Sequence, residues 1–175
     1  MNKIIVIGTT GSGKTTLAKE ISTKLKLPHI QLDSLFWKPN WEEASDQEFF
    51  SKIRDAIRSD QWVVDGNYSR TQSITLSEAD TVVWIDLPFW QTFYQLIFRT
   101  LGRIRSKQEL WENTGNKESL KMMFSRDSIL LWFFKTYHRN RKKYLKMMSD
   151  SSNGEIRFIH LKSNSEKKEF LQNIQ

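Results

Sequence analysis

Short β-branched runs alternate with longer amphipathic stretches along the chain, which is typical of a parallel sheet with crossover helices. The runs expected to form strands are Lys3–Ile7, Pro28–Leu32, Trp62–Val64, Thr81–Leu87 and Ile156–Leu161. Helices are expected over Gly13–Leu25, Glu42–Ser59, Phe89–Arg103 and Ser128–Met148, followed by a short C-terminal one. The pattern therefore predicts a three-layer α/β fold, with helices on both faces of a five-stranded parallel sheet.

Charge is distributed unevenly along this pattern. The chain has 175 residues, the size of one ordinary domain over residues 1–175, and a net charge of +7. Residues 99–146 hold 13 Lys and Arg against 4 Asp and Glu, whereas the rest holds 14 against 16. Gly115-Asn116 predicts a loop within residues 105–119. We expect a basic helical lid inserted at about residues 99–141, whose field attracts nucleotide phosphates, nucleic acid or an acidic membrane surface.

Composition excludes several kinds of site. There are no cysteines, which rules out a disulfide framework, a thiolate zinc site and a cysteine nucleophile. The apolar run at the N-terminus ends at Gly8 and is too short for a signal-peptide core. The longest later run, Ile129–Phe134, falls well short of the about 20 residues that span a membrane. A cytoplasmic protein with no membrane partner is the expectation.

The first strand leads directly into a phosphate-binding motif. Residues 8–15, Gly-Thr-Thr-Gly-Ser-Gly-Lys-Thr, fit G-x-x-x-x-G-K-[ST] in full. Glycines let consecutive N–H groups point at the phosphates, Lys14 reaches the outer phosphates, and the Thr15 hydroxyl is placed to coordinate Mg²⁺. The predicted nucleotide-binding residues of this loop and the helix after it are Gly8, Gly11, Ser12, Gly13, Lys14, Thr15 and Thr16.

Beyond this loop, nearly the whole chain resembles the P-loop small-molecule kinases of the adenylate-kinase-related group. The likeness is strongest to a bacterial family labelled DNA topology modulation protein, FlaR-related. It is carried by the phosphate loop and by His29–Trp41, Trp62–Tyr68, Ala79–Pro88 and Glu109–Ser119. The resemblance implies a P-loop NTPase fold with strand order 2-3-1-4-5, ATP and Mg²⁺ as cofactors, and transfer of a phosphoryl group to a small-molecule acceptor.

The same resemblance implies roles for residues after the third strand. Asp65-Gly66 is similar to the Asp-Gly of adenylate kinases, whose carboxylate holds Mg²⁺ through water, so Asp65 joins Thr15 as a predicted metal-site residue. Asp65, Asn67 and Arg70 are then candidates for contacts with the acceptor. Arg70 stands one residue further from the Asp-Gly than the family's arginine, and Asp65 as a plain turn residue remains the alternative.

Other candidates follow the second and fifth strands. Asp33 would orient the acceptor, or accept a proton from its hydroxyl, unless it only caps a helix with Ser34. Trp37 would stack on an acceptor ring, unless it only packs beside Pro39. Ser163 would contact the base, because the family passes a loop near the adenine there, although loop polarity alone gives the same residue.

Arginines of the basic segment are candidates to neutralise the migrating phosphoryl group, because their planar fork binds two oxygens at once. Arg103 and Arg139 are the first choices as catalytic residues, beside Lys14 and Asp33. The alternative is a solvated basic face.

Three functions are compatible with these features. The leading hypothesis is an enzyme that moves the γ-phosphoryl group of Mg-ATP to a small-molecule acceptor, with a nucleotide or nucleoside expected. The second is a nucleotide-dependent regulator that binds nucleic acid, for which Trp111, Trp132, Phe133, Tyr137 and Tyr144 would offer stacking surfaces. Their helical spacing favours core positions instead, so nucleic acid is the less favoured partner. The third is an NTPase without an acceptor.

Overall fold

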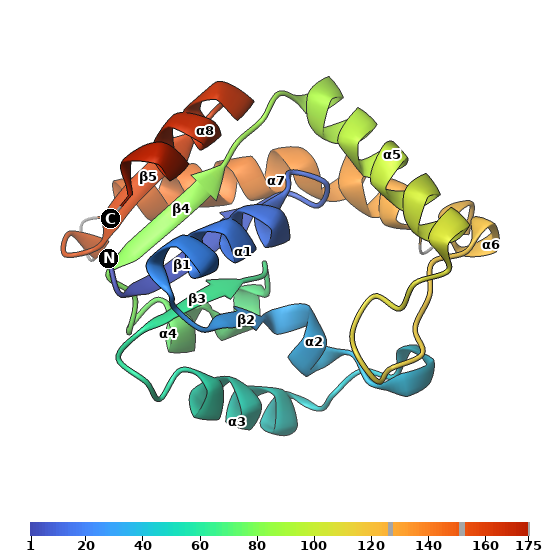
Figure 1. Ribbon diagram of the computed structural model, residues 1–175, viewed down its shortest axis with the longest axis horizontal. Coiled ribbons are helices and arrows are strands. Elements are labelled where there is room, and N and C mark those ends of the chain that lie inside the picture. The colour runs from blue at the N-terminus through green and yellow to red at the C-terminus, as the bar shows by residue number, and fades with distance from the viewer. Residues whose placement is uncertain (126–127, 151–152, 175) are drawn as a thin grey trace.

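The computed structural model describes residues 1–125, 128–150 and 153–174, and these form a five-stranded sheet whose neighbouring strands are all parallel. The strands are β1 (Lys3–Gly8), β2 (His29–Gln31), β3 (Trp62–Asp65), β4 (Thr81–Ile85) and β5 (Arg157–Leu161). Their order is β2-β3-β1-β4-β5 (Figure 1). The predicted fold class and strand order are therefore confirmed.

Helices cover both faces of the sheet. They are α1 (Lys14–Leu25), α2 (Leu32–Phe36), α3 (Asp46–Ala56), α4 (Gln72–Thr75), α5 (Phe89–Ser106), α6 (Leu120–Met123), α7 (Ile129–Ser149) and α8 (Asn164–Asn173). Across the described residues, no helix has the length and apolar character needed to cross a membrane.

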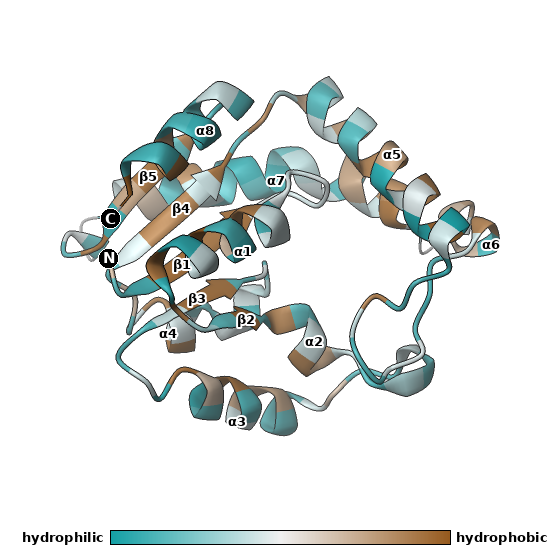
Figure 2. Cartoon of the chain, viewed as in Figure 1, coloured by the Kyte–Doolittle hydropathy of each residue, from teal (hydrophilic) through white to brown (hydrophobic). Residues whose placement is uncertain are grey.

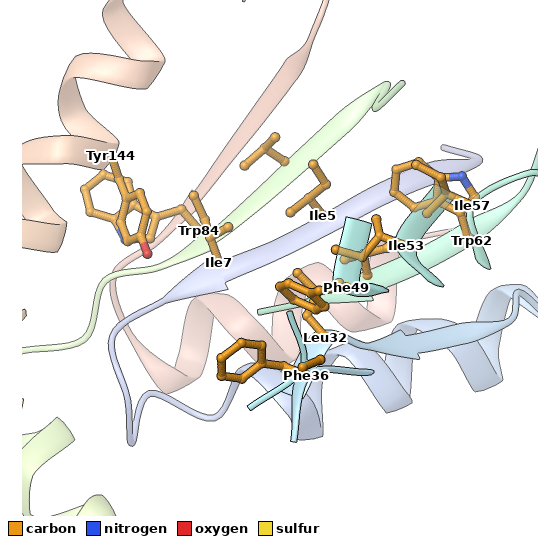
Figure 3. Packing of buried hydrophobic residues seen from close by; sticks show 13 residues of the cluster. Ile5, Ile7, Leu32, Phe36, Phe49, Ile53, Ile57, Trp62, Trp84 and Tyr144 are labelled. Atoms are coloured by element: carbon orange, nitrogen blue, oxygen red, sulfur yellow. The ribbon is translucent and has the colours of Figure 1, made fainter. Parts of the chain in front are cut away.

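Two hydrophobic cores follow from the alternation of side chains along the buried strands. Ile4 and Val6 of β1 pack in one cluster with Leu17 and Ile21 of α1, and residues of α8 close that cluster. Ile5 and Ile7 point the other way and pack with residues of α3, α4 and α7, as Figure 3 shows for Phe49, Ile53 and Tyr144. The hydropathy colouring follows the same division, with brown strands between helices that are teal on their outer sides (Figure 2).

Several boundaries differ from the sequence prediction, each for a local reason. The second strand ends at Gln31 rather than Leu32, because Leu32 begins helix α2 and turns into the core. Helix α3 begins at Asp46 rather than Glu42, because the Ser45 hydroxyl accepts a hydrogen bond from the backbone N–H of Glu48 and caps it there. The short helices α2, α4 and α6 were not predicted, since helices of four or five residues leave no periodic signal.

The basic insertion consists of α5, the loop of residues 107–119, α6 and α7. Leu96 of α5 packs with Phe133 and Tyr137 of α7 in a third small core. Helix α5 continues through the first two residues of the expected loop, and from residue 107 no helix or strand is assigned until α6 begins at Leu120. The helices on either side of the loop extend beyond both bounds of the insertion predicted at about residues 99–141, and its identity as a lid stays a prediction.

Candidate active site

The loop that joins β1 to α1 packs tightly against neighbouring residues. At Gly8 and Gly11 this packing leaves no room for a side chain. Gly11 has a φ of +84°, and a Cβ there would lie 2.8 Å from the Leu96 Cβ and 2.9 Å from the carbonyl oxygen of Thr92. At Gly8 a Cβ would lie 2.7 Å from the carbonyl oxygen of Ile85. Helix α5 therefore packs directly on the loop. The Ser12 hydroxyl is buried here without a hydrogen-bond partner, so a polar atom is free to meet a ligand.

Lys14 is the charged centre of the site. Its Nζ donates to the carbonyl oxygen of Thr9 at 3.2 Å. Burial lowers the pKa of Lys14 to about 8, while the charges of Asp33 and Asp65 act to raise it and that of Arg99 acts to lower it. Four charged groups from α1, α2, β3 and α5 thus converge at the carboxyl ends of the strands, which is where open α/β sheets bind ligands.

Asp65, the last residue of β3, is held by two partners. The Thr15 hydroxyl donates to Asp65 Oδ2 at 2.5 Å, and His29 Nε2 lies 2.8 Å from Asp65 Oδ1. A hydroxyl and a carboxylate side by side are hard oxygen donors, which suit Mg²⁺ when phosphate and water complete the octahedron. The described residues contain no group of three or more His, Cys, Asp or Glu that could hold a metal without such help. Thr15 and Asp65 therefore fit the predicted magnesium site.

Asp33 lies in the first turn of α2, and its carboxylate oxygen Oδ1 accepts a hydrogen bond from the Tyr68 hydroxyl at 2.7 Å. Burial raises the pKa of Asp33, and it outweighs the lowering effects of the Tyr68 hydrogen bond and of the Lys14 and Arg99 charges. Sequence reasoning named Asp33 but missed Tyr68, which no motif marks. A carboxylate so placed beside the phosphate-binding lysine can orient an acceptor or accept its proton.

Two residues predicted to bind the acceptor are engaged elsewhere. The Asn67 side chain pairs with the backbone of Gly8, donating from Nδ2 to the carbonyl oxygen and accepting from Gly8 N–H at 3.4 Å. Arg70 forms an ion pair with Asp46 at 2.7 Å, and its Cζ lies 4.7 Å from the ring centroid of Phe36. Asn67 thus joins β3 to the phosphate loop, and Arg70 would have to leave Asp46 to reach a ligand.

The arginines of the insertion are arranged differently from the predicted ranking. Arg99 acts electrostatically on Lys14 and Asp33, and its Nε is buried without a hydrogen-bond partner. Burial and, to a smaller extent, the charge of Arg103 lower the pKa of Arg99 to about 10, against the raising effects of Glu118 and Asp33. Arg103 itself pairs with Glu118 at 3.2 Å. Arg139 is exposed on α7 with its Cζ 5.9 Å from the ring of Trp132, whereas it is Arg99 whose charge acts on Lys14 and Asp33.

A buried asparagine ties the loop of residues 107–119 to the segment after α2. Asn116 is 2% exposed; its Nδ2 donates to the carbonyl oxygen of Lys38 at 2.8 Å, and its Oδ1 accepts from Trp41 N–H at 3.0 Å. Beside it, the rings of Trp37 and Trp111 stack with centroids 6.1 Å apart. Trp37 therefore packs against the insertion in this arrangement; the Gly115-Asn116 pair predicted a loop here but not this contact.

The segment after β5 gives Ser163 another role than base contact. Its hydroxyl accepts from the backbone N–H of Glu166 at 3.1 Å and caps α8. The capped helix carries Lys167, whose Nζ lies 3.7 Å from the position of a Cβ on Gly13. Burial lowers the pKa of Lys167. A second amine thus lies beside the phosphate loop, where sequence reasoning missed it, while Thr16 is exposed on α1.

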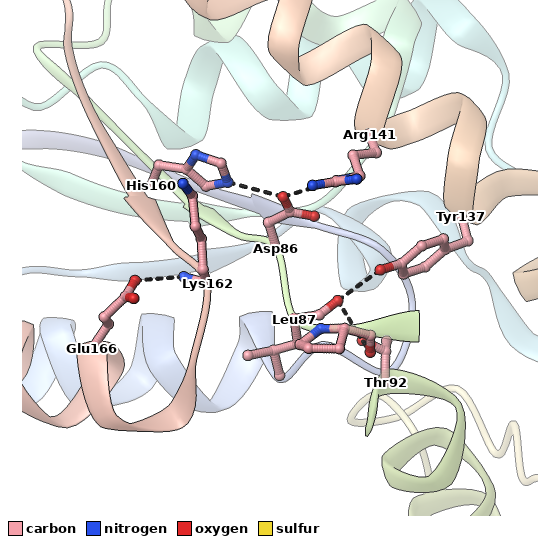
Figure 4. A network of polar contacts seen from close by, with 9 residues as sticks. Asp86, Leu87, Thr92, Tyr137, Arg141, His160, Lys162 and Glu166 are labelled. Carbon is pink, nitrogen blue, oxygen red and sulfur yellow. Dashed lines mark hydrogen bonds and ion pairs between the residues drawn. The ribbon is translucent and has the colours of Figure 1, made fainter. Parts of the chain in front are cut away.

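A polar network anchors α7 to the sheet (Figure 4). Asp86, which follows β4, accepts from Arg141 Nε at 3.1 Å, and its Oδ2 lies 2.9 Å from His160 Nε2 of β5. One turn earlier on α7, the Tyr137 hydroxyl donates to the carbonyl oxygen of Leu87 at 2.8 Å. These contacts hold α7 against the segment that follows β4. Arg141 is engaged in the ion pair with Asp86 that stabilises this packing.

Comparisons with known proteins agree with this geometry. A sequence model described as an AAA domain matches residues 4–84. A shikimate kinase from Enterococcus faecalis (strain ATCC 700802 / V583) is 25% identical over 159 residues, covering 87% of this chain and 90% of the relative. The crystal structure of a gluconokinase from Sinorhizobium meliloti 1021 shares the fold, with a TM-score of 0.52 at 16% identity, covering 98% of this chain and 87% of that one.

These matches support a P-loop small-molecule kinase, and thus an enzyme, without identifying its acceptor. They do not support the narrower likeness to the topology modulation family or to adenylate kinases.

Proposed function

We propose that the chain is a phosphotransferase that moves the γ-phosphoryl group of Mg-ATP to a hydroxyl group of a small-molecule acceptor. The observation that carries this proposal is the meeting of Lys14 with Asp33 and Arg99 at one end of the sheet. A phosphate-binding cation, a candidate base and a second cation are the groups that phosphoryl transfer to an alcohol needs.

Each group has a role that its surroundings support. Amide groups of the glycine loop and the N-terminus of α1 would bind the β- and γ-phosphates. Lys14 would hold the γ-phosphoryl oxygens, and Arg99, with an unpartnered buried Nε, would neutralise charge on the migrating group from the other side. Thr15 and Asp65 would hold Mg²⁺, which supplies charge neutralisation between the phosphates. Lys167 would meet the nucleotide beside Gly13.

The carboxylate of Asp33 favours a hydroxyl acceptor over a phosphate acceptor. Its raised pKa and its hydrogen bond from Tyr68 suit a group that orients an alcohol and takes its proton. A phosphate acceptor would instead need a free cation, and Arg70 is paired with Asp46. The relatives named above are kinases of shikimate and gluconate, both of which carry hydroxyl groups. A nucleoside belongs to the same chemical class, so the expected nucleoside stays a candidate and a nucleotide becomes less favoured.

A coupled assay of ADP release tests this proposal. The purified chain is given Mg-ATP alone and then a panel of hydroxy acids, sugars, polyols, nucleosides and nucleoside monophosphates. We expect one hydroxyl-bearing class to accelerate ADP release, and Lys14→Ala to lower that rate about a thousandfold, because it removes the cation at the γ-phosphoryl group. Lys19→Ala, an exposed position on the same helix, is the matched control and should keep the rate.

Other results would favour the alternatives. ATP hydrolysis that no acceptor accelerates would indicate an NTPase. Tight nucleic-acid binding near physiological salt would revive the regulator hypothesis. Against the regulator hypothesis, Phe133, Tyr137 and Tyr144 are buried and cannot stack on bases, as their helical spacing had indicated.

A further inference from the structure

Exposed hydrophobic side chains gather on one part of the molecule. In the described ranges, every large hydrophobic side chain that is exposed falls between residues 90 and 145, in or next to α5, α6 and α7. They are Trp90, Tyr94, Phe98, Leu101, Leu120, Met122, Phe124, Leu131, Trp132, Phe134 and Leu145. Scattered single apolar residues are normal on a surface, but a concentration of this kind marks an interaction site.

Helix α5 is apolar on two sides. Its inner side is buried through Thr92, Leu96 and Thr100. On its outer side Trp90, Tyr94 and Phe98 follow each other at intervals of four residues and are 62%, 55% and 72% exposed. Figure 1 shows α5 at the periphery of the molecule, at the end opposite both termini. More than half of the surface of each of these three side chains therefore stays exposed to solvent.

Aromatic contacts continue this stripe onto α7. The ring of Phe93 lies 6.0 Å from that of Trp90 and 5.2 Å from that of Phe134. Phe134 is half exposed, as is Leu131 three residues earlier on α7. We call these exposed side chains the outer aromatic face; its members are Trp90, Tyr94, Phe98, Leu101, Leu131 and Phe134.

The two helices that carry this face, α5 and α7, have charged side chains of only one sign, with three and six Lys and Arg and no Asp or Glu. Three of these nine are engaged elsewhere: Arg99 at the candidate site, Arg103 with Glu118 and Arg141 with Asp86. Exposed basic residues continue the apolar stripes by one turn, with Arg105 four residues after Leu101 and Lys135 four residues after Leu131. An occupant of the face must therefore accept aromatic side chains and offer negative charge around them.

We propose that the outer aromatic face binds the surface of an anionic lipid membrane. Aromatic and aliphatic side chains would enter the boundary between headgroups and acyl chains, and the flanking Lys and Arg would meet lipid phosphates. A second copy of the chain fits less well, because a two-fold interface would set two acid-free basic helices against their own kind. The binding is peripheral, in keeping with helices that cannot span a bilayer, and it does not depend on the proposed activity.

Co-sedimentation of the full chain with lipid vesicles tests the proposal. We expect binding to vesicles of phosphatidylglycerol mixed with phosphatidylcholine, at least about tenfold weaker binding to phosphatidylcholine alone, and release as salt is raised. Phe98→Ser on α5 and Lys135→Glu on α7 should each weaken binding by about tenfold. The control Lys168→Glu makes the same charge change on exposed α8 and should leave binding unchanged.

Several results would overturn the proposal, and they can be told apart from one another. Equal binding to both kinds of vesicle, or none to either, overturns the proposal. So does a dimer in solution that Phe98→Ser dissociates, or nucleic-acid binding that Phe98→Ser abolishes while vesicle binding is absent. A thermal unfolding curve checks that Phe98→Ser is folded, and Lys135→Glu decides the matter if it is not.

Discussion

The phosphate side and the acceptor side that we propose for this site are built in opposite ways. The phosphate side is a continuous segment, residues 8–15, whose backbone is shaped by glycines and packed against α5. The acceptor side is made of side chains from segments far apart in the sequence: Asp33 with Tyr68, and Trp37 and Trp41 with the loop that carries Asn116. Backbone amides bind any triphosphate, whereas a choice among acceptors requires side chains whose combination can vary.

This contrast predicts where substitutions have large and small effects. Changes on the phosphate side should alter the use of ATP whatever the acceptor. Changes on the acceptor side should leave ATP binding intact.

The largest effect is expected on the acceptor side. Asp33→Asn should lower kcat by about a hundredfold to ten-thousandfold, because it removes the base while keeping the shape of the side chain. Nucleotide binding, measured by calorimetry, should change little. Asp60→Asn, at a fully exposed position, is the control for loss of a carboxylate. A kcat within a few-fold of the wild type would indicate a phosphate acceptor, which needs no base.

The pH dependence of ATP use should reflect the protonation state of the Lys14 side chain. Its pKa is lowered to about 8, so the empty site loses this cation as the pH rises above that value. We expect kcat/KM for ATP to fall about tenfold per pH unit there, as the cation is titrated. At saturating ATP, bound phosphate restores the charge, so kcat should stay flat. A decline in kcat of the same size would point to a different group.

Substitutions at two glycines distinguish the stability effect of close packing from that of backbone conformation. Gly11 and Gly115 both have positive φ, but only at Gly11 would a Cβ meet neighbouring atoms. Gly115→Ala should cost about 1 kcal/mol of unfolding free energy, through the left-handed conformation alone. Gly11→Ala should cost a further 1–3 kcal/mol or so, because α5 must move, and should raise KM for ATP. Equal losses in urea unfolding would refute direct packing of α5 on the loop.

Asn116→Ala tests the hydrogen bonds that join the insertion to the acceptor side. The variant leaves Trp41 N–H and the Lys38 carbonyl without their partner, at a cost of about 1–3 kcal/mol. We expect KM for the acceptor to rise several-fold while KM for ATP is unchanged. Lys117→Ala, at the exposed neighbouring position, should change neither value. A rise in KM for ATP alone would indicate that the Asn116 hydrogen bonds support the phosphate side instead.

The smallest effect is expected at Lys167. Lys167→Met should raise KM for ATP about threefold to tenfold, because a partly screened ion pair contributes on the order of 1 kcal/mol. The acceptor KM and the thermal midpoint should be unchanged. Lys168→Met, on the exposed side of the same helix, is the matched control. Identical ATP kinetics in both variants would remove Lys167 from the site.

The phosphate loop and the alternation of strands and helices could be predicted because their signals are local or periodic. Residues 8–15 follow a buried strand and open a helix within one short segment. A choice among the arginines could not be made from sequence, for the opposite reason. Helical spacing says which residues share a side of α5 or α7, but α5 has large apolar side chains on its exposed side and mostly threonines on its buried side, so spacing cannot say which side meets the site.

The sequence by itself determined that a parallel sheet would present a phosphate-binding loop ahead of α1, because adjacent residues specify that turn. Only the tertiary structure decided that the charge of Arg99 acts on Lys14, that Tyr68 donates a hydrogen bond to Asp33, and that Asn116 joins two loops. These contacts join positions far apart in the chain. Their existence depends on how the helices pack, which no local pattern encodes.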